Sequence, residues 1–415
     1  MAILLLAIQS RATAESNFSI AYRPEYSDNV NLSATDPQNE LINTVDFGFH
    51  WSKRSSKFDG RVALEAESRN YKNNTFDDEF LPRLEMILNW NAVPDRFTWT
   101  VQDFARQETI VNRAALTPAN EQNVNVFLTG PDGSFHFGLR NSLQLGVRYG
   151  RTDFEITNED SKRAAGFARW IYQLSSAATL SFNVDVSSVD FKDESLLDFD
   201  RRDLFFRVAG QTARSDLVLD VGDTSIDIDD RTGTEPLVRF SWNRRLTPKS
   251  TMGILLAREV SDAGRNLLVR GVTDPRLSPE GGARGNLFID KRVNAFYTIT
   301  GRRTSATVTF FAGERDFVIN TQDERSLGGN FEIRRTLRRR LLGSFFLNAE
   351  KQEFPNPPEQ INRDKALGLR VTYQVGRGTF VGGGVAWRDR NSDNPTQNYR
   401  ETRVSLEIGY NSRRR

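Results

Sequence analysis

The 415-residue sequence contains no cysteine, only two histidines and only three methionines. Without cysteine the chain has no disulfides, no thiolate nucleophile, no cysteine-ligated metal and no lipid anchor attached to a cysteine. Histidine is the side chain best suited to acid–base chemistry near pH 7, so its scarcity argues against an enzyme. We therefore expect no catalytic residues, no cofactor and no metal site.

Two further absences narrow the class of protein. The formal net charge is only +2, with 56 Lys and Arg against 54 Asp and Glu, so nucleic acid is not an expected partner. No stretch approaches the roughly 20 consecutive apolar residues that a membrane-spanning helix needs. Disorder is also excluded, because 29 Phe, 9 Tyr and 6 Trp are more aromatic residues than unfolded segments carry. A soluble globular protein remains, or a β-barrel, whose membrane signal is spread over many strands.

The first residues are typical of an export signal. An apolar run over residues 2–8 precedes Ala12-Thr13-Ala14, the small-x-small pattern of a signal-peptidase site. The basic residue that usually precedes such a run is missing, which fits a truncated or wrongly assigned start; the alternative is a buried N-terminal strand or helix turn. We interpret residues 1–14 as a signal peptide and residues 15–415 as a single domain.

Apolar residues alternate with polar ones along most of the remaining chain. Successive side chains of a strand point to opposite faces, so each alternating stretch predicts a strand with one apolar and one polar face. Many of the stretches approach ten residues, roughly what a tilted strand needs to cross a bilayer. The clearest are residues 18–22, 45–51, 124–128, 143–149, 180–186, 204–208, 217–221, 238–242, 367–375 and 404–410.

Short and long connections alternate between these predicted strands. Links such as residues 53–57 and 140–142 take turns with longer polar segments such as 28–40 and 108–122. A transmembrane barrel has this asymmetry, with tight periplasmic turns and longer extracellular loops, whereas a β-sandwich has no reason for it. We predict an all-β, closed antiparallel transmembrane β-barrel of about 16–20 strands in the bacterial outer membrane. A soluble β-sandwich or adhesin is the alternative.

Three segments need a separate interpretation. Residues 123–139, interrupted by Gly130-Pro131-Asp132-Gly133, fit either one long kinked strand or a hairpin. Residues 229–235 suggest a polar loop. Residues 261–282 form the longest connection and are the candidate for a plug inside the barrel.

The polar face of the predicted strands supplies candidates for the lining of an aqueous lumen. Two are the histidines, which lie four strands apart, about 20 Å or more, and so cannot share a metal. Mixed charge suits hydrated, weakly charged polymers or small solutes better than a strongly ion-selective filter. The candidates are His50, His136, Arg148, Asp185, Arg207, Asp220, Arg239, Arg370 and Glu407.

Three further groups of residues, one acidic, one rich in arginine and one aromatic, could be functional. An acidic cluster, Asp223, Asp227, Asp229 and Asp230, resembles a calcium loop but lacks the glycine and distal glutamate of an EF-hand, so a solvated loop is the better interpretation. The arginine-rich residues 334–340 and 413–415 map to the periplasmic rim, either as a solvated rim or as a docking surface. Aromatic residues on the polar face could stack on sugar rings: Phe205, Phe311 and Phe346.

Three segments resemble a family of outer-membrane barrels associated with PEP-CTERM/exosortase systems and exopolysaccharide loci. They are residues 25–33 (EYSDNVNLS), 141–150 (NSLQLGVRYG) and 189–191 (VDF), turn-and-strand patterns within a similarity that runs from about Asn17 to Tyr410. The charged C-terminal residues 411–415 depart from the family. The resemblance implies an outer-membrane location beside polysaccharide-export genes, and it implies no catalytic residues.

On this basis we expect a passive conduit or accessory barrel in exopolysaccharide export. The expected surroundings are outer-membrane lipid and lipopolysaccharide, with polysaccharide and periplasmic export components as partners. A general porin for small solutes is the first alternative, and a barrel hydrolase is the second.

Overall fold

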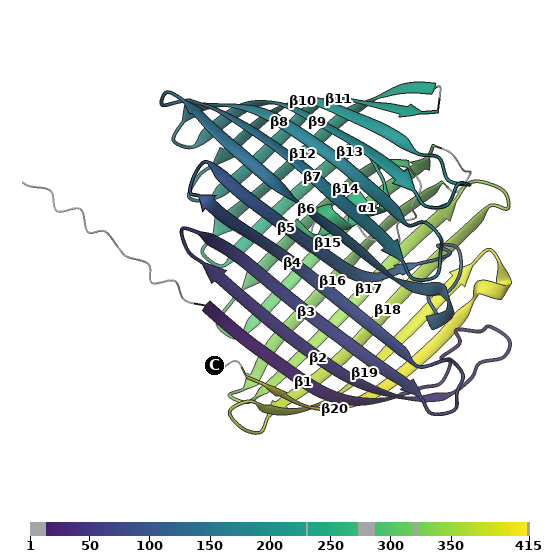
Figure 1. The fold of residues 1–415 in the computed structure, drawn as a ribbon. Helices are drawn as coiled ribbons and strands as arrows, with labels where there is room; N and C mark the ends of the chain where they lie inside the picture. Colours follow the sequence, from purple (N-terminus) through teal and green to yellow (C-terminus); the bar gives the residue numbers. More distant parts are fainter. Residues whose placement is uncertain (1–13, 230, 273–286, 319–322, 413–415) are drawn as a thin grey trace, which may run out of the picture.

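The computed structural model describes residues 14–229, 231–272, 287–318 and 323–412, and these form one closed barrel of 20 antiparallel strands (Figure 1). Consecutive strands pair with each other around the barrel. The strands are β1 (Ala14–Ser27), β2 (Glu40–Arg54), β3 (Phe58–Tyr71), β4 (Glu79–Val93), β5 (Phe97–Thr109), β6 (Glu121–Phe137), β7 (Asn141–Phe154), β8 (Ser161–Ser175), β9 (Ala178–Phe191), β10 (Phe199–Gln211), β11 (Ser215–Ile228), β12 (Arg231–Thr247), β13 (Ser250–Ser261), β14 (Phe288–Thr300), β15 (Thr304–Phe317), β16 (Glu324–Arg338), β17 (Leu341–Phe354), β18 (Gln360–Gln374), β19 (Thr379–Ser392) and β20 (Tyr399–Asn411). The described helices are α1 (Ala263–Val272) and the single 3-10 turns η1 (Pro118–Asn120) and η3 (Pro395–Gln397).

The first and last strands pair and close the sheet. Ile20 lies opposite Tyr410, and Tyr26 lies opposite Val404. Closure leaves no strand edge exposed, which is a requirement for a sheet in lipid, because hydrocarbon offers backbone groups no hydrogen-bond partner. The predicted fold, a closed antiparallel barrel, is confirmed, with 20 strands at the top of the predicted range.

The two faces of the barrel differ in the way the alternation predicts. Apolar side chains such as Leu406, Phe206 and Val147 point outward and are 66%, 59% and 58% exposed. Polar side chains of the same strands, such as Asp203 and Asp220, point inward and are buried. No helix among the described residues is long and apolar enough to cross a membrane. The apolar outer surface of the closed barrel places the chain in the bacterial outer membrane.

The structure corrects two expectations about individual strands and decides a third. Residues 123–137 belong to one long strand, β6, rather than to a hairpin, and residues 138–139 lie in the turn after it. Val124 and Val126 face the lumen instead of the lipid, because α1 covers them there. Residues 231–235, expected within a polar loop, belong to β12, since Arg231 pairs with Ile228 of β11. The expected signal peptide lies outside the described residues except for Ala14, the first residue of β1.

Candidate functional site in the barrel lumen

Two of the longer connections fold into the lumen and narrow it. One joins β13 to β14, and its described part, residues 262–272, contains α1; we call it the helix loop. The other is the β5–β6 loop, residues 110–120, which contains η1. Figure 1 shows α1 within the barrel, and it contacts β5 and β6 on the wall beyond the strands that carry it. The plug expected within residues 261–282 is therefore seen in its first part, while residues 273–282 lie outside the described residues.

The start of the helix loop is built from a cap and two small residues. Asp262 Oδ1 accepts a hydrogen bond of 3.1 Å from the backbone N–H of Arg265, so Asp262 caps the helix N-terminus. Ala263 packs on the inward valines of β6. The missing side chain of Gly264 allows close approach to β7, since a Cβ there would lie 2.7 Å from Thr152 Oγ1.

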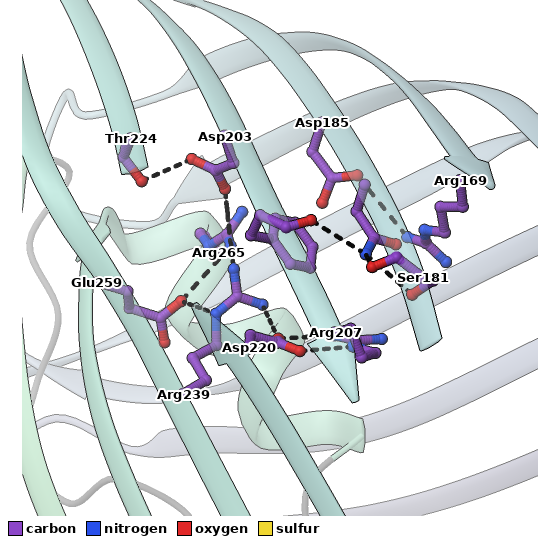
Figure 2. A network of polar contacts seen from close by, with 12 residues as sticks. Arg169, Ser181, Asp185, Asp203, Arg207, Asp220, Thr224, Arg239, Glu259 and Arg265 are labelled. Atoms are coloured by element: carbon purple, nitrogen blue, oxygen red, sulfur yellow. Dashed lines mark hydrogen bonds and ion pairs between the residues drawn. The ribbon is translucent and has the colours of Figure 1, made fainter. Parts of the chain in front are cut away.

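Ion pairs hold the helix loop against β8, β10 and β13. Arg163 of β8 donates to Asp262 at 2.6 Å, and both side chains are buried. Arg265 lies 3.5 Å from carboxylate oxygens of both Asp203 and Glu259 (Figure 2). Each of these three carboxylates is at most 5% exposed, so each needs its arginine partners to offset the loss of water.

The pKa of the Asp262 carboxyl reflects this environment. Burial raises the pKa, but the Arg163 guanidinium and the backbone N–H of Arg265 outweigh burial and hold it below its usual range. Asp262 is therefore ionised at neutral pH, and its ionisation favours the docked helix loop.

Three of the predicted lumen residues come together beside α1. Arg207 of β10 makes a two-pronged contact with Asp220 of β11, at 2.6 and 2.8 Å. Arg239 of β12 lies 3.4 Å from Asp220 and 3.3 Å from Glu259, so it connects this pair to the helix loop (Figure 2). The phenyl ring of Phe205 lies between the two guanidinium groups, at 5.6 Å from Arg207 and 5.2 Å from Arg239.

The same arrangement recurs nearby on β7 and β8. Predicted residue Arg148 makes two 2.7 Å hydrogen bonds to Asp132. The Phe167 ring lies between the guanidinium groups of Arg148, at 5.5 Å, and Arg169, at 4.1 Å. Predicted residue Asp185 is the acidic neighbour of Arg169, but their closest atoms are 4.0 Å apart.

The remaining predicted residues are spread over other strands. His50 lines a separate cavity with Glu15 and Glu85. His136 lies near the short-turn end of β6, opposite Ser142. Arg370 lies opposite Gly384, and Glu407 lies opposite Gly382. The structure therefore does not gather the nine predicted residues into one site.

The β5–β6 loop docks mainly through hydrogen bonds from arginine and glutamine side chains to backbone carbonyl oxygens. Arg113 donates to the carbonyl oxygens of Pro358 and Asn356, at 2.6 and 3.0 Å. Its own carbonyl accepts from Gln360 Nε2 at 2.9 Å. Arg390 donates to the carbonyl of Ala114 at 2.9 Å. These contacts reach strands β18 and β19, so the loop spans the lumen from the wall that carries it.

Cavities remain on both sides of these loops. A cavity of about 400 Å³ lies along the β5–β6 loop, and carboxylates prevail among its charged lining residues: Glu108, Glu121, Glu324, Glu350 and Asp364, against Arg325, Lys365, Arg388 and Arg390. Two others, of about 160 and 470 Å³, lie along α1 and below it toward the short-turn end. Arginines prevail over aspartates among the charged residues that line those two cavities.

The three aromatic residues proposed as a sugar-stacking track all point inward, but each lies against a glycine of the next strand. Phe205 lies opposite Gly222, Phe311 opposite Gly328 and Phe346 opposite Gly368. A Cβ at Gly328 or Gly368 would overlap the ring, and a Cβ at Gly222 would overlap the Leu204 carbonyl and the Cα and Cβ atoms of Phe205. Aromatic cover of a strand glycine stabilises a curved sheet. Phe205 and Phe311 are buried, and only Phe346 exposes much of its ring to the lumen.

The described residues of the acidic cluster are not arranged as a metal site. Asp223 and Asp227 lie on β11, where Asp227 accepts a hydrogen bond from Thr232. Asp230 lies outside the described residues. Among the residues that the structure describes, no group of three or more potential ligands is placed to hold a metal ion.

Several residues that hold the helix loop are not among the lumen residues predicted from the sequence. Arg201 and Asp203 could have been found, because they share the alternation of Arg207 along β10. Glu259 lies in a segment with apolar residues on both faces, so the alternation does not indicate whether its side chain faces the lipid or the lumen. Arg265 has no signal, since its position depends on how the loop folds back into the barrel.

The sequence matches no model of a protein family and no curated protein. Similar solved structures from Pseudomonas aeruginosa include the siderophore receptor PirA, at 12% identity over 96% of this chain and 81% of that chain, with a TM-score of 0.45. A mutant of the ferric enterobactin receptor PfeA has 9% identity, the same shares and a TM-score of 0.48. OccK2 (OpdF) has 9% identity over 96% and 97%, with a TM-score of 0.40. The assignment of a barrel rests on this chain's own strand pairing.

Proposed function

We propose that this chain is a passive outer-membrane channel for small hydrophilic solutes. The observation that carries the proposal is the lumen itself: a 20-strand barrel is wide enough for an aqueous interior, and here two docked loops narrow that interior and line it with charge. Such a passage admits hydrated molecules by size and charge and needs no energy source.

Reconstitution tests this proposal. The purified full-length protein in planar bilayers should give stepwise conductance, and liposomes that contain it should swell in small sugars faster than in larger oligosaccharides. Protein-free liposomes are the control. A folded, inserted barrel without conductance or solute entry would rule out the channel.

Exopolysaccharide export is the second candidate, and it rests on the sequence resemblance together with one feature of the rim. Eight of the nine short turns carry Lys or Arg, with Asp95 as the one acidic residue between strands at that end. A basic rim fits an acidic polymer or an acidic periplasmic export component, with lipid and lipopolysaccharide around the barrel. Both loops narrow the lumen, so this function requires them to move aside for a chain.

Current block distinguishes the two candidates. Under export, a long acidic polysaccharide added at the short-turn side should interrupt the current in long events. Under simple diffusion, the polymer should leave the current unchanged while its monomers pass.

A further inference from the structure

Two neighbouring cavities, which we call the passage, lie along α1 and below it, and two arginines line both of them. The cavity along α1 and the cavity below it share four lining residues, Leu128, Arg148, Phe167 and Arg169. A solute that moves between the two cavities must therefore pass these side chains.

The charge along this passage favours anions. Five arginines and three aspartates line the two cavities together: Arg148, Arg163, Arg169, Arg201 and Arg265, with Asp132, Asp185 and Asp203. An excess of fixed positive charge in a low-dielectric wall raises the local concentration of anions.

Most of these arginines are already occupied, and Arg169 differs from them. Arg148 is bound twice to Asp132, and Arg201 is bound twice to Asp203. Arg169 has a buried Nε without a hydrogen-bond partner among the described residues, and its ion pair with Asp185 spans 4.0 Å. The Phe167 ring, 4.1 Å away, holds the guanidinium in position. The Arg169 side chain is 35% exposed, so its terminal nitrogens, rather than the buried Nε, are left for a ligand.

The lining of the larger cavity indicates the chemical character of the part of the ligand that does not contact Arg169. Its lining is rich in hydroxyl and amide groups: Asn89, Thr98, Thr100, Gln102, Ser134 and Gln144. Such groups donate to and accept from hydroxyls but offer no additional charge. Its volume of about 470 Å³ accommodates a molecule of monosaccharide size.

We propose that Arg169 binds the carboxylate of a hydroxylated acid, with the hydroxyls of the ligand in the cavity below. The guanidinium matches a carboxylate in a two-pronged geometry, as it does in the Arg207–Asp220 pair of the same wall. The ligand is either a free sugar acid or one uronate residue of an acidic polymer. This inference deepens the proposed channel function and rests on it for its biological meaning.

Calorimetry on the full-length protein in detergent tests the binding directly. Glucuronate should bind, and neutral glucose should bind at least about tenfold more weakly. Arg169→Gln should lower the glucuronate affinity about tenfold or more, and Arg169→Lys should restore part of it. Arg370→Gln, a change to an inward arginine on β18, is the matched control and should leave the affinity unchanged. Equal affinity for glucose, or equal losses in the Arg169→Gln and Arg370→Gln variants, would overturn the proposal.

A second arm separates the two sources of the carboxylate. A hexamer of uronate residues should bind more tightly than the monomer, and in an Arg169-dependent way, if the ligand is part of a polymer. It should bind no more tightly, or be excluded, if the ligand is a free sugar acid. Because calorimetry does not require conduction, binding without conductance would contradict only the channel, and conductance without binding would contradict only this site.

Discussion

The helix loop and the β5–β6 loop both fold into the lumen, but different forces hold them. The helix loop is anchored by buried charges, of which the Arg163–Asp262 pair is the clearest. The β5–β6 loop is anchored mainly by backbone carbonyls and side-chain amides, as in the contacts of Arg113 with Pro358 and Gln360. A buried charge without its partner is costly, whereas a single hydrogen bond to a carbonyl oxygen that water can reach in part adds less net stability. Both loops narrow the lumen, but we expect the attachment of the helix loop to depend on pH and that of the β5–β6 loop to be largely independent of pH.

The largest effect is expected at Asp203. This carboxylate is 1% exposed and binds Arg201, itself 2% exposed, through two hydrogen bonds of 2.8 Å. Asp203→Asn leaves the arginine charge uncompensated and should lower the free energy of unfolding by about 3–5 kcal/mol. Urea unfolding in detergent measures it. Asp393→Asn, in a half-exposed pair with Arg363, should cost only about 0–1 kcal/mol. Similar costs at both sites would show that buried charge does not govern this wall.

Asp262→Asn tests the docking of the helix loop itself. The change keeps an oxygen that can cap the helix but leaves the Arg163 charge without its carboxylate partner, at a cost of about 1–3 kcal/mol. The loop should leave the wall more often, and single-channel conductance should rise.

Gly264→Val provides a matched change without altered charge. Its side chain would collide with Thr152, so it should raise conductance in the same direction. Unchanged conductance in both variants would mean that the helix loop does not restrict the passage.

Acid should separate the two loops. The pKa of Asp262 is lowered in the folded protein, so its contribution is fully present above the unfolded-state value of about 3.9 and is lost as the pH falls through the folded value. Conductance should therefore rise below about pH 4 in the wild-type channel. This acid-induced rise in conductance should be missing in Asp262→Asn. A rise of equal size in that variant would exclude Asp262 as its source.

The smallest effect is expected in the β5–β6 loop. Arg113→Gln removes hydrogen bonds to two carbonyl oxygens that water can reach in part, so the loss should be about 1 kcal/mol. The shift in urea midpoint should be the same near pH 7 and near pH 4. A strong pH dependence would show that charge anchors this loop as well, and the comparison between the loops would fail.

The sequence predicted the direction of side chains on the barrel wall better than the contacts inside the lumen. Alternation correctly placed Leu406 and Phe206 on the lipid side, because a strand has a fixed period of two and lipid accepts only apolar groups. It misplaced Val124 and Val126, because an inward valine looks the same in sequence whether lipid or α1 covers it. Arg207, Asp220 and Arg239 were chosen individually, while their mutual contact follows from the strand register and could not be seen.

The chain's own pattern of apolar and polar residues determined an all-β barrel, the alternation of short and long connections and the polar character of the lumen. These are local properties, set by side-chain direction along each strand. The tertiary structure decided the strand number, the inward course of both loops and the set of arginines that meet aspartates beneath α1. Those features depend on contacts between residues far apart in the chain, such as Arg163 with Asp262, and periodicity carries no information about such pairs.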